Sequence, residues 1–390
     1  MKDVKISDDI RYIGCDDEDL DLFESQYIVP NGMAYNSYVI KDEKTVVMDT
    51  IDERRTDEWI ENLTRELDGV IPTYLVISHM ESDHAFNIGN LISRYPNIKL
   101  VGNVKTFQLL SQFFDIPDLD ERKIVVSEGD ELNIGKHTLK FIMAPMVHWP
   151  EVMFTYEKEE KVLFTADAFG KFGTLDTEEE WACEARRYYF NICGKYGMQV
   201  QMVLKKLANY EIKTICPLHG PILKENLEYY INKYDIWSKY EPEEKGIFIV
   251  HASIHGNTAN AANELKEIIN KKNPSVKVSI CDLTREDWAE AIEDSFKYDR
   301  IVFAASSYNM DLFPPMKHLL DNLKEKNFQN RKVGIIENGS WAPSAGKVMK
   351  SYLDACKNIT YCNPEVVTIK SRLKDDSREK LNELADSLIK

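Results

Sequence analysis

Paired cysteines are missing from this sequence. Its seven Cys are scattered, and none forms a CxxC pair. An odd, dispersed set favours reduced thiols packed as small hydrophobic groups over a disulfide framework. Because a structural zinc site or a rubredoxin needs CxxC pairs, we expect neither within the chain.

Long apolar runs and an excess of positive charge are also absent. No run of about 18 apolar residues occurs, and the N-terminal stretch lacks the apolar core of a signal peptide, which predicts a cytoplasmic protein without membrane spans. The 49 Lys and Arg against 65 Asp and Glu give a net charge of −16. Such a surface repels polyanions, so we expect neither nucleic acid nor an anionic membrane as a partner.

What the sequence does contain is enough apolar material for more than one core. It has 390 residues, 43% hydrophobic and 29% charged, which is typical of a globular protein with two domains. A polar stretch with Pro and Gly at residues 238–246 separates two different sequence patterns. We therefore predict one domain over residues 1–245 and a second over residues 246–390.

The first half shows short β-branched runs with interspersed amphipathic stretches, which predicts mixed α/β structure with much sheet. The second half alternates five strand patterns with five helical patterns. Strands are expected near residues 247–251, 276–280, 300–304, 332–336 and 366–369. This repetition predicts a parallel, doubly wound sheet of the flavodoxin-like order, with ligands at the carboxyl ends of the strands.

Metal-binding side chains gather directly after the predicted strand at residues 74–78. His79, Glu81, Asp83 and His84 fall within six residues, so a short loop could turn several of them toward one point. Three more candidates follow strands further along the chain: His148, Asp167 and His219. Seven ligands are too many for one tetrahedral zinc and are enough for two metals if one carboxylate bridges them.

Taken singly, these residues have ordinary explanations. A lone Asp at the end of a strand is usually a cap or a turn former, and a lone His is usually a surface or hydrogen-bonded core residue. We give His137, His251 and His318 that ordinary interpretation, because no ligand-like residue stands beside them in the sequence. The clustering of the other seven favours a metal site.

A phosphate-binding loop is predicted after the first strand of the second half. Hydroxyl groups, backbone N–H groups and a helix N-terminus can hold a phosphate dianion there without Lys or Arg. The loop lacks the GxGxxG and GK[ST] patterns, which favours a mononucleotide. The residues concerned are Ser253, Ile254, His255, Gly256, Asn257 and Thr258.

Two further loops follow the third and fourth strands of this half. Each offers small residues and one large aromatic side chain that could stack on a flat ring. The candidate ligand contacts are Ser306, Ser307, Tyr308 and Asn309 in one loop and Asn338, Gly339, Ser340 and Trp341 in the other. Together the three loops resemble the phosphate and isoalloxazine loops of flavodoxins, which bind flavin mononucleotide (FMN).

The motif His79-x-Glu81-x-Asp83-His84, with His148, Asp167 and His219, resembles the metallo-β-lactamase superfamily and specifically the flavodiiron proteins. Hydrolytic members carry His where Glu81 stands, and a carboxylate there suits an iron pair better than a zinc pair. The resemblance covers almost the whole chain. It implies a metallo-β-lactamase-like αββα sandwich followed by a flavodoxin-like domain of five parallel strands.

The same resemblance implies which residue holds which metal. His79, Glu81 and His148 would hold one iron, Asp83, His84 and His219 the other, and Asp167 would bridge them; His84 is uncoordinated in some members. Trp149 and Glu151 are expected to shape the pocket from just past His148. His255 departs from the bulky aromatic residue that the family often has at that position.

The implied activity is the reduction of dioxygen to water, of nitric oxide to nitrous oxide, or of both, which would protect against oxygen or nitrosative stress. A diferrous pair and a reduced flavin hold two electrons each, enough for either reaction. We expect an external electron donor, rubredoxin or alternatively a reduced deazaflavin, because no such domain is fused to the chain. A head-to-tail homodimer, or a dimer of such dimers, is implied by the resemblance alone.

Two other functions stay open on the sequence. A dinuclear zinc hydrolase of the metallo-β-lactamase superfamily would use the metal site but leaves the flavodoxin-like half unexplained. An electron carrier or redox sensor with a vestigial metal site would bind flavin without iron. The motifs do not distinguish dioxygen from nitric oxide as the preferred substrate.

Overall fold

The computed structural model describes residues 4–390 and divides into two compact units. Of the described residues, the first unit contains 4–189 and Met198–Asp235, and the second contains Phe190–Gly197 and Ile236–Lys390. The predicted boundary between residues 245 and 246 falls inside a strand, β16 (Glu244–Ala252). Tyr240 belongs with the second unit because its carbonyl accepts a hydrogen bond from the Arg331 guanidinium at 2.9 Å. The exact boundary stays a proposal.

The first unit contains two main sheets. One has the strand order β1 (Ile10–Tyr12), β6 (Tyr38–Ile40), β7 (Val46–Met48), β8 (Tyr74–Val76), β9 (Lys99–Gly102), β10 (Lys123–Val125). The other has the order β11 (Glu131–Asn133), β12 (Thr138–Met143), β13 (Met153–Glu157), β14 (Val162–Phe164), β15 (Thr214–Cys216). Two short pairs, β2 (Cys15–Asp17) with β5 (Met33–Tyr35) and β3 (Leu22–Phe23) with β4 (Tyr27–Ile28), complete the strands.

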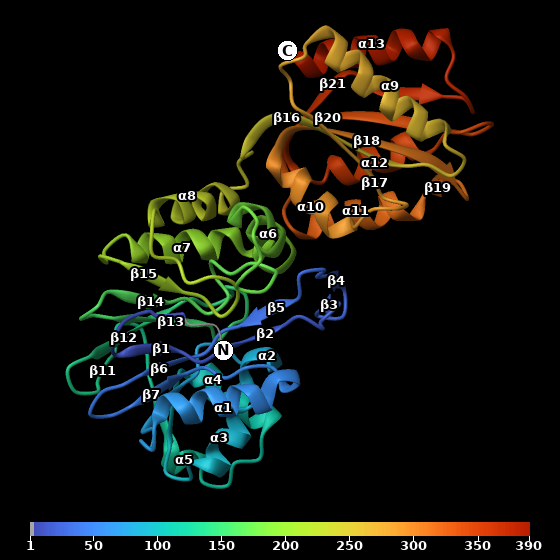
Figure 1. Ribbon diagram of the computed structural model, residues 1–390. Helices are drawn as coiled ribbons and strands as arrows, with labels where there is room; N and C mark the ends of the chain where they lie inside the picture. The colour runs from blue at the N-terminus through green and yellow to red at the C-terminus, as the bar shows by residue number, and fades with distance from the viewer. Residues whose placement is uncertain (1–3) are drawn as a thin grey trace. The chain divides into compact units, whose positions relative to one another are not determined.

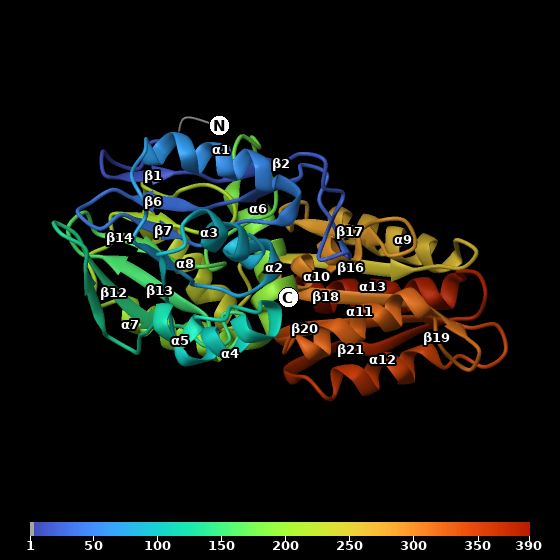
Figure 2. The same cartoon turned by 90° about the horizontal axis from the view of Figure 1, so that it is seen from below.

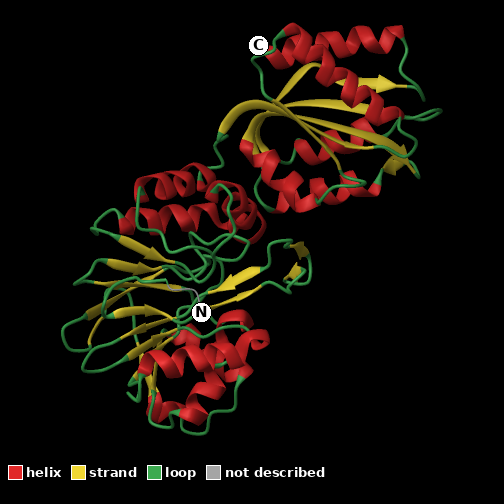
Figure 3. Cartoon of the chain, in the orientation of Figure 1, coloured by secondary structure: helices red, strands yellow, loops and turns green. Residues whose placement is uncertain are grey.

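Helices lie on the outer faces of these two sheets, giving four layers (Figures 1 and 3). Those beside the first sheet are η1 (Glu53–Arg55), α1 (Thr56–Leu67), α2 (Ser82–Ala85), α3 (Ile88–Arg94), α4 (Val104–Phe113) and α5 (Leu119–Arg122). Those beside the second are α6 (Trp181–Tyr188), α7 (Gly197–Leu207) and α8 (Leu227–Ser238). The short segments η2 (Tyr189–Cys193) and η3 (Gly194–Tyr196), which follow α6 in the chain, belong almost entirely to the second unit.

The core of the first unit lies between the two sheets. Buried side chains such as Tyr38, Val46 and Val76 from one sheet meet Phe141 and Phe164 from the other. Because both faces of the central strands are covered, β6, β7, β8 and β14 are buried along their whole length, whereas β12, nearer the edge, alternates. The αββα sandwich expected from the resemblance is confirmed.

The second unit is a parallel sheet with helices on both faces. Its order is β17 (Val278–Asp282), β16, β18 (Tyr298–Tyr308), β20 (Gln329–Asn338), β21 (Lys357–Ile369), with β19 (Asp311–Leu312) paired to the end of β18. Helices α9 (Asn257–Lys272) and α13 (Asp375–Ile389) pack together, as do α10 (Trp288–Lys297), α11 (Pro314–Glu325) and α12 (Ala345–Leu353) on the opposite face (Figures 1 and 2). The order 2-1-3-4-5 confirms the flavodoxin-like prediction.

The connections of both units place polar loops at the carboxyl ends of buried strands. In the first unit these are the loops after β8, β12, β14 and β15, and in the second those after β16, β18, β20 and β21. Within residues 4–390, no helix combines the length and the apolar character needed to cross a membrane.

Candidate metal centre and nucleotide pocket

The structure brings all seven predicted metal-binding residues together in the first unit. Each follows a strand that the core packing holds in place: β8 leads into His79, Glu81 and the short helix α2 with Asp83 and His84, while β12, β14 and β15 lead into His148, Asp167 and His219. They form two groups, and within each group one ligand atom per residue lies within 4.8 Å of all the others.

The first group contains His79, Glu81, His148 and Asp167. The Nε2 atom of His148 lies 3.0 Å from Glu81 Oε2 and 3.0 Å from Asp167 Oδ2. The Nε2 atom of His79 lies 3.3 Å from Glu81 Oε2 and 3.6 Å from Asp167 Oδ2. Two imidazole nitrogens and two carboxylate oxygens thus converge on one point.

The second group contains Asp83, His84 and His219. Asp83 Oδ2 lies 3.3 Å from the Nε2 atom of His84 and 3.2 Å from that of His219. Asp167 reaches this group with its other oxygen, since Oδ1 lies 3.1 Å from His84 Nε2. One oxygen of Asp167 therefore faces each group, which is the placement that a bridging carboxylate requires.

The polar atoms of the cluster fit cations. Both oxygens of Asp83 and Oδ1 of Asp167 are buried and accept no hydrogen bond. A buried carboxylate without a partner is costly unless it is protonated or coordinates a metal. Burial raises the pKa of Asp83 to about 7, and a bound cation would favour the ionised form of this group. Mixed imidazole and carboxylate donors in two groups suit a pair of transition-metal ions.

A second layer of groups orients the ligands. Glu151 is fully buried, and its Oε1 lies 2.8 Å from His79 Nδ1 and accepts a hydrogen bond from the Met80 N–H at 2.8 Å. His219 Nδ1 lies 2.8 Å from the Ala34 carbonyl. With Nδ1–H donated in both rings, each Nε2 is left free to bind a metal. Trp149 packs edge-on against His79, with ring centroids 5.4 Å apart.

Two groups near the cluster were not predicted. Asp49, which follows β7, accepts hydrogen bonds from the backbone N–H groups of Ser78 and His79 at 2.6 and 3.3 Å, and so shapes the ligand loop. The β3–β4 hairpin places Phe23 edge-on against His219, with centroids 5.4 Å apart. Neither has a sequence motif, because both contacts join segments far apart in the chain.

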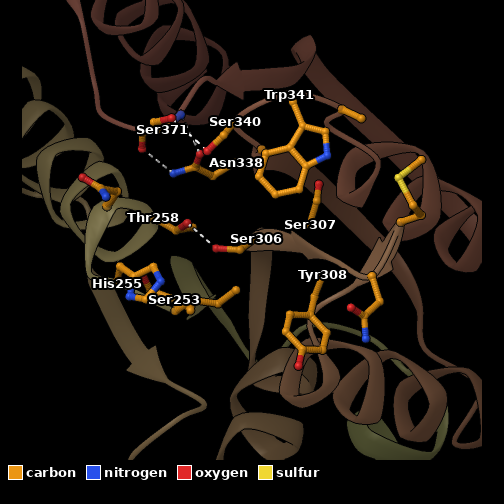
Figure 4. Close-up of a pocket in the computed structure, with 16 residues that line it drawn as sticks. Ser253, His255, Thr258, Ser306, Ser307, Tyr308, Asn338, Ser340, Trp341 and Ser371 are labelled. Atoms are coloured by element: carbon orange, nitrogen blue, oxygen red, sulfur yellow. Dashed lines mark hydrogen bonds between the residues drawn. The ribbon is translucent and has the colours of Figure 1, made fainter.

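The predicted nucleotide loops line one cavity of about 540 Å³ in the second unit (Figure 4). Thirteen of the fourteen predicted residues line it, and Gly256 instead caps α9 with a φ of 84°, a conformation that favours glycine. Met310 and Ala342 from the same loops also line it. Ser371, which follows the fifth strand, was not predicted and completes the wall.

Hydroxyl and amide groups organise the cavity. Thr258 Oγ1 and Ser306 Oγ lie 2.9 Å apart, and the Ser253 hydroxyl is buried without a hydrogen-bond partner. Asn338 donates from Nδ2 to the Ser371 carbonyl at 2.8 Å and accepts from the Ser371 N–H at 3.1 Å, which ties two loops together. At the opposite side Tyr308 and Trp341 are 45% and 89% exposed, so their rings are available for stacking (Figure 4).

The uncharged, hydroxyl-rich end suits a phosphate beside the N-terminus of α9, and the aromatic end suits a planar ring. This is the combination that a flavin mononucleotide needs. Among the lining residues, His255 is the one side chain that can carry a positive charge.

Comparison with known proteins agrees with this geometry. A family model described as ODP family beta lactamase matches residues 33–220. An uncharacterized protein of Methanocaldococcus jannaschii is 33% identical over 326 residues, covering 81% of this chain and 80% of that protein. The anaerobic nitric oxide reductase flavorubredoxin of Aeromonas hydrophila is 27% identical over 385 residues, covering 96% of this chain and 76% of that protein.

Solved structures match both units. The rubredoxin oxygen:oxidoreductase of Desulfovibrio gigas superposes with a TM-score of 0.90 at 24% identity, covering 99% of this chain and 97% of the other. The flavodiiron protein of Giardia intestinalis superposes with a TM-score of 0.89 at 25% identity, covering 99% and 96%.

Proposed function

This chain belongs to the flavodiiron protein family, and we propose from that premise that it is an oxidoreductase that reduces dioxygen to water, nitric oxide to nitrous oxide, or both. Reduction of dioxygen consumes four electrons and four protons per molecule. Coupling two nitric oxide molecules to nitrous oxide and water consumes two of each. The observation that carries the proposal is the pair of ligand groups that share Asp167, in one chain with a cavity fitted to a flavin.

The residues that would hold the two irons are those of the two groups. His79, Glu81 and His148 would hold one iron, Asp83, His84 and His219 the other, and Asp167 would bridge them. A diiron centre supplies a Lewis-acidic site that can give up two electrons, and a reduced FMN supplies two more. The donor set, four imidazoles and three carboxylates, favours iron over the softer ions that prefer thiolates.

The protein's own groups would prepare this site in two ways. Glu151 and the Ala34 carbonyl fix the tautomers of His79 and His219, so that each Nε2 points inward. The β3–β4 hairpin and Trp149 lay aromatic rings against His219 and His79 and keep bulk water from them. The ligands thus lie between aromatic rings and the buried carboxylates of Glu151 and Asp49, which accept hydrogen bonds from the ligand loop.

In the second unit, Ser253, Thr258 and the N-terminus of α9 would bind the FMN phosphate. Tyr308 and Trp341 would lie against the isoalloxazine ring. The loop from Ser306 to Asn309 and the loop from Asn338 to Ser340 would contact the ribityl chain and the ring edge. Since no acidic side chain lines the cavity, the phosphate would meet no fixed negative charge there.

A head-to-tail homodimer would bring each flavin to the partner's irons. Four exposed hydrophobic residues of the second unit, Ile254, Tyr308, Met310 and Trp341, all line the flavin cavity. In the first unit Leu22 and Ile28 are exposed on the β3–β4 hairpin, and Phe86 directly follows α2. Exposed apolar surface around both sites is typical of a surface that a partner covers.

An external protein would supply the electrons, with rubredoxin as the proposed donor and a reduced deazaflavin as the alternative. The flavorubredoxin and the rubredoxin oxygen:oxidoreductase among the similar proteins carry that donor in their names. A cytoplasmic location is part of the same proposal.

The decisive experiment combines metal and flavin analysis with rapid mixing. The purified protein should contain two irons and one FMN per chain and show a flavin spectrum. Anaerobically reduced protein should be reoxidised on mixing with dioxygen or nitric oxide, at rates that rank the two substrates. Zinc in place of iron, with hydrolysis of a thioester or phosphodiester, would replace the proposal by the hydrolase alternative. Flavin without iron would favour an electron carrier.

A further inference from the structure

A third group of metal-binding side chains lies apart from the seven-residue cluster. Asp9 directly precedes β1, His137 lies in the turn between β11 and β12, and Glu160 lies in the turn between β13 and β14. One ligand atom from each lies within 4.8 Å of the other two. The group shares no residue with the proposed diiron site.

The His137 ring is held in one orientation by a buried carboxylate. His137 and Glu157 are both fully buried, and His137 Nδ1 lies 2.9 Å from Glu157 Oε1. Glu157 also accepts hydrogen bonds from the backbone N–H groups of Glu159 and Glu160, at 2.8 and 2.7 Å. The same carboxylate therefore fixes the His137 ring and the turn that carries Glu160.

With Nδ1–H donated to Glu157, the lone pair of His137 Nε2 points outward, where Asp9 Oδ2 lies 3.2 Å away. An imidazole lone pair and a carboxylate oxygen at that distance repel each other unless a proton or a metal ion lies between them. With an ion at Nε2, contacts would run from the Glu157 carboxylate through the His137 ring to the ion. This is the carboxylate–histidine–metal arrangement found at protein metal sites.

We propose that Asp9, His137 and Glu160 form a surface site for one divalent transition-metal ion such as Zn²⁺. One imidazole and two carboxylates are a borderline donor set that suits Zn²⁺, and water can fill the remaining positions because Asp9 is about one-third exposed at its side chain. The ion would join three chain segments of the first unit. By binding the folded state alone it would stabilise that unit.

Lys136 competes with the ion for Asp9. Its Nζ lies 2.5 Å from Asp9 Oδ2, so the Lys136 ammonium neutralises the Asp9 carboxylate when no metal is bound. The Lys136 side chain is 62% exposed and can leave Asp9 at little cost. Lys136 and His137 are adjacent in the chain, yet their removal should change metal affinity in opposite directions.

The test uses the full-length, iron-loaded protein, equilibrated with Zn²⁺ by dialysis and then analysed for both metals. Wild type should hold one zinc per chain in addition to its iron, with the iron content unchanged. His137→Gln should lose this zinc, and Glu157→Gln should bind it 10–100-fold more weakly. Lys136→Gln should bind it more tightly. His318→Gln, on the exposed face of α11, should match wild type.

No additional zinc in wild type, or the same zinc content in His137→Gln, would overturn the proposal. So would an affinity that Lys136→Gln leaves unchanged. If His137→Gln proves unstable, Asp9→Asn removes a ligand from the exposed side of the site and must also lose the zinc. Because iron is counted in every sample, a failure of the diiron assignment would be seen separately.

Discussion

The Nε2 atoms of His84 and His219 lie 3.0 Å apart, with both rings buried. His219 directs its Nδ1 to the Ala34 carbonyl, so its Nε2 carries a lone pair toward His84. Two ring nitrogens at this separation need a shared proton or a shared cation between them. The carboxylates of Asp83 and Asp167 approach the same point. This relationship makes His84 a ligand in our proposal, although the sequence left its role open.

We therefore expect His84→Ala to lose one of the two irons. The variant should retain about one iron per chain, because the first group of ligands is intact, and it should keep its FMN. Metal analysis of protein purified in parallel with wild type and with His318→Ala measures this directly. Two irons per chain in His84→Ala would show that His84 is not a ligand.

The second prediction concerns Glu151, which touches no metal in our proposal and acts through His79. Glu151→Ala removes the acceptor for His79 Nδ1–H and for the Met80 N–H, and should weaken iron binding or activity by 10–100-fold. Glu151→Gln keeps one amide oxygen as acceptor and should lie between the alanine variant and wild type. The measurement is the rate at which a chelator removes iron. Equal rates in all three proteins would contradict the positioning role.

Much of the candidate site was predictable because the residues that indicate it lie close together in the sequence or directly after a recognisable strand. His79, Glu81, Asp83 and His84 are compressed into six residues after a recognisable apolar strand, and the other ligands also follow strands. The five strands of the second half were predictable for the same reason, since each contains a short run rich in β-branched residues and is followed by a helical pattern. In each case the strand and the ligand or helix that follows it are neighbours in the chain.

The features that were missed depend on contacts between distant segments. Asp49 lies 29 residues before its partner Ser78, and Asp9 lies 128 residues before His137. His137 was thus interpreted as an ordinary surface or hydrogen-bonded core histidine, because its carboxylate neighbours are distant in the sequence. Residues 190–197 pack with the second unit, because the Lys326 ammonium bonds the Asn191 carbonyl at 2.8 Å, which no local pattern could reveal. Ser371 could have been predicted from the sequence, because it lies in the loop after the fifth strand, and the other lining residues lie in loops after strands of the same sheet.

The third prediction separates phosphate contacts from ring contacts in the cavity. The buried Ser253 hydroxyl has no partner within the protein, so we expect it to donate to the FMN phosphate. A hydrogen bond to a charged group contributes about 1.5–3 kcal/mol, so Ser253→Ala should lower FMN affinity about 10–100-fold. Affinity for riboflavin, which lacks the phosphate, should not change.

Flavin fluorescence quenching by the flavin-free full chain gives both affinities, and Ser351→Ala, at an exposed position on α12, is the matched control. An equal loss of affinity for FMN and riboflavin would place Ser253 away from the phosphate.

The fourth prediction concerns the pH dependence of stability at Asp17, a fully buried carboxylate of β2. Although burial raises its pKa, the hydrogen bonds from Arg54 and Arg55 outweigh burial and hold the pKa below its usual value. A carboxyl with a depressed pKa in the folded state stabilises the fold above its unfolded pKa of about 3.9. That contribution is lost as the pH falls through the folded value.

Asp17→Asn should therefore lower the free energy of unfolding by about 1–3 kcal/mol at pH 7 and at pH 5, since both arginines are partly exposed and water replaces part of the interaction. The difference from wild type should narrow at pH 3, which is below the unfolded pKa of the carboxyl. Urea unfolding of both proteins at the three pH values measures it. Asp19→Asn, which removes a mostly exposed partner of Arg55, should show little change at any pH. A deficit in Asp17→Asn that is the same at pH 3 as at pH 7 would assign the role of Asp17 to packing rather than to charge.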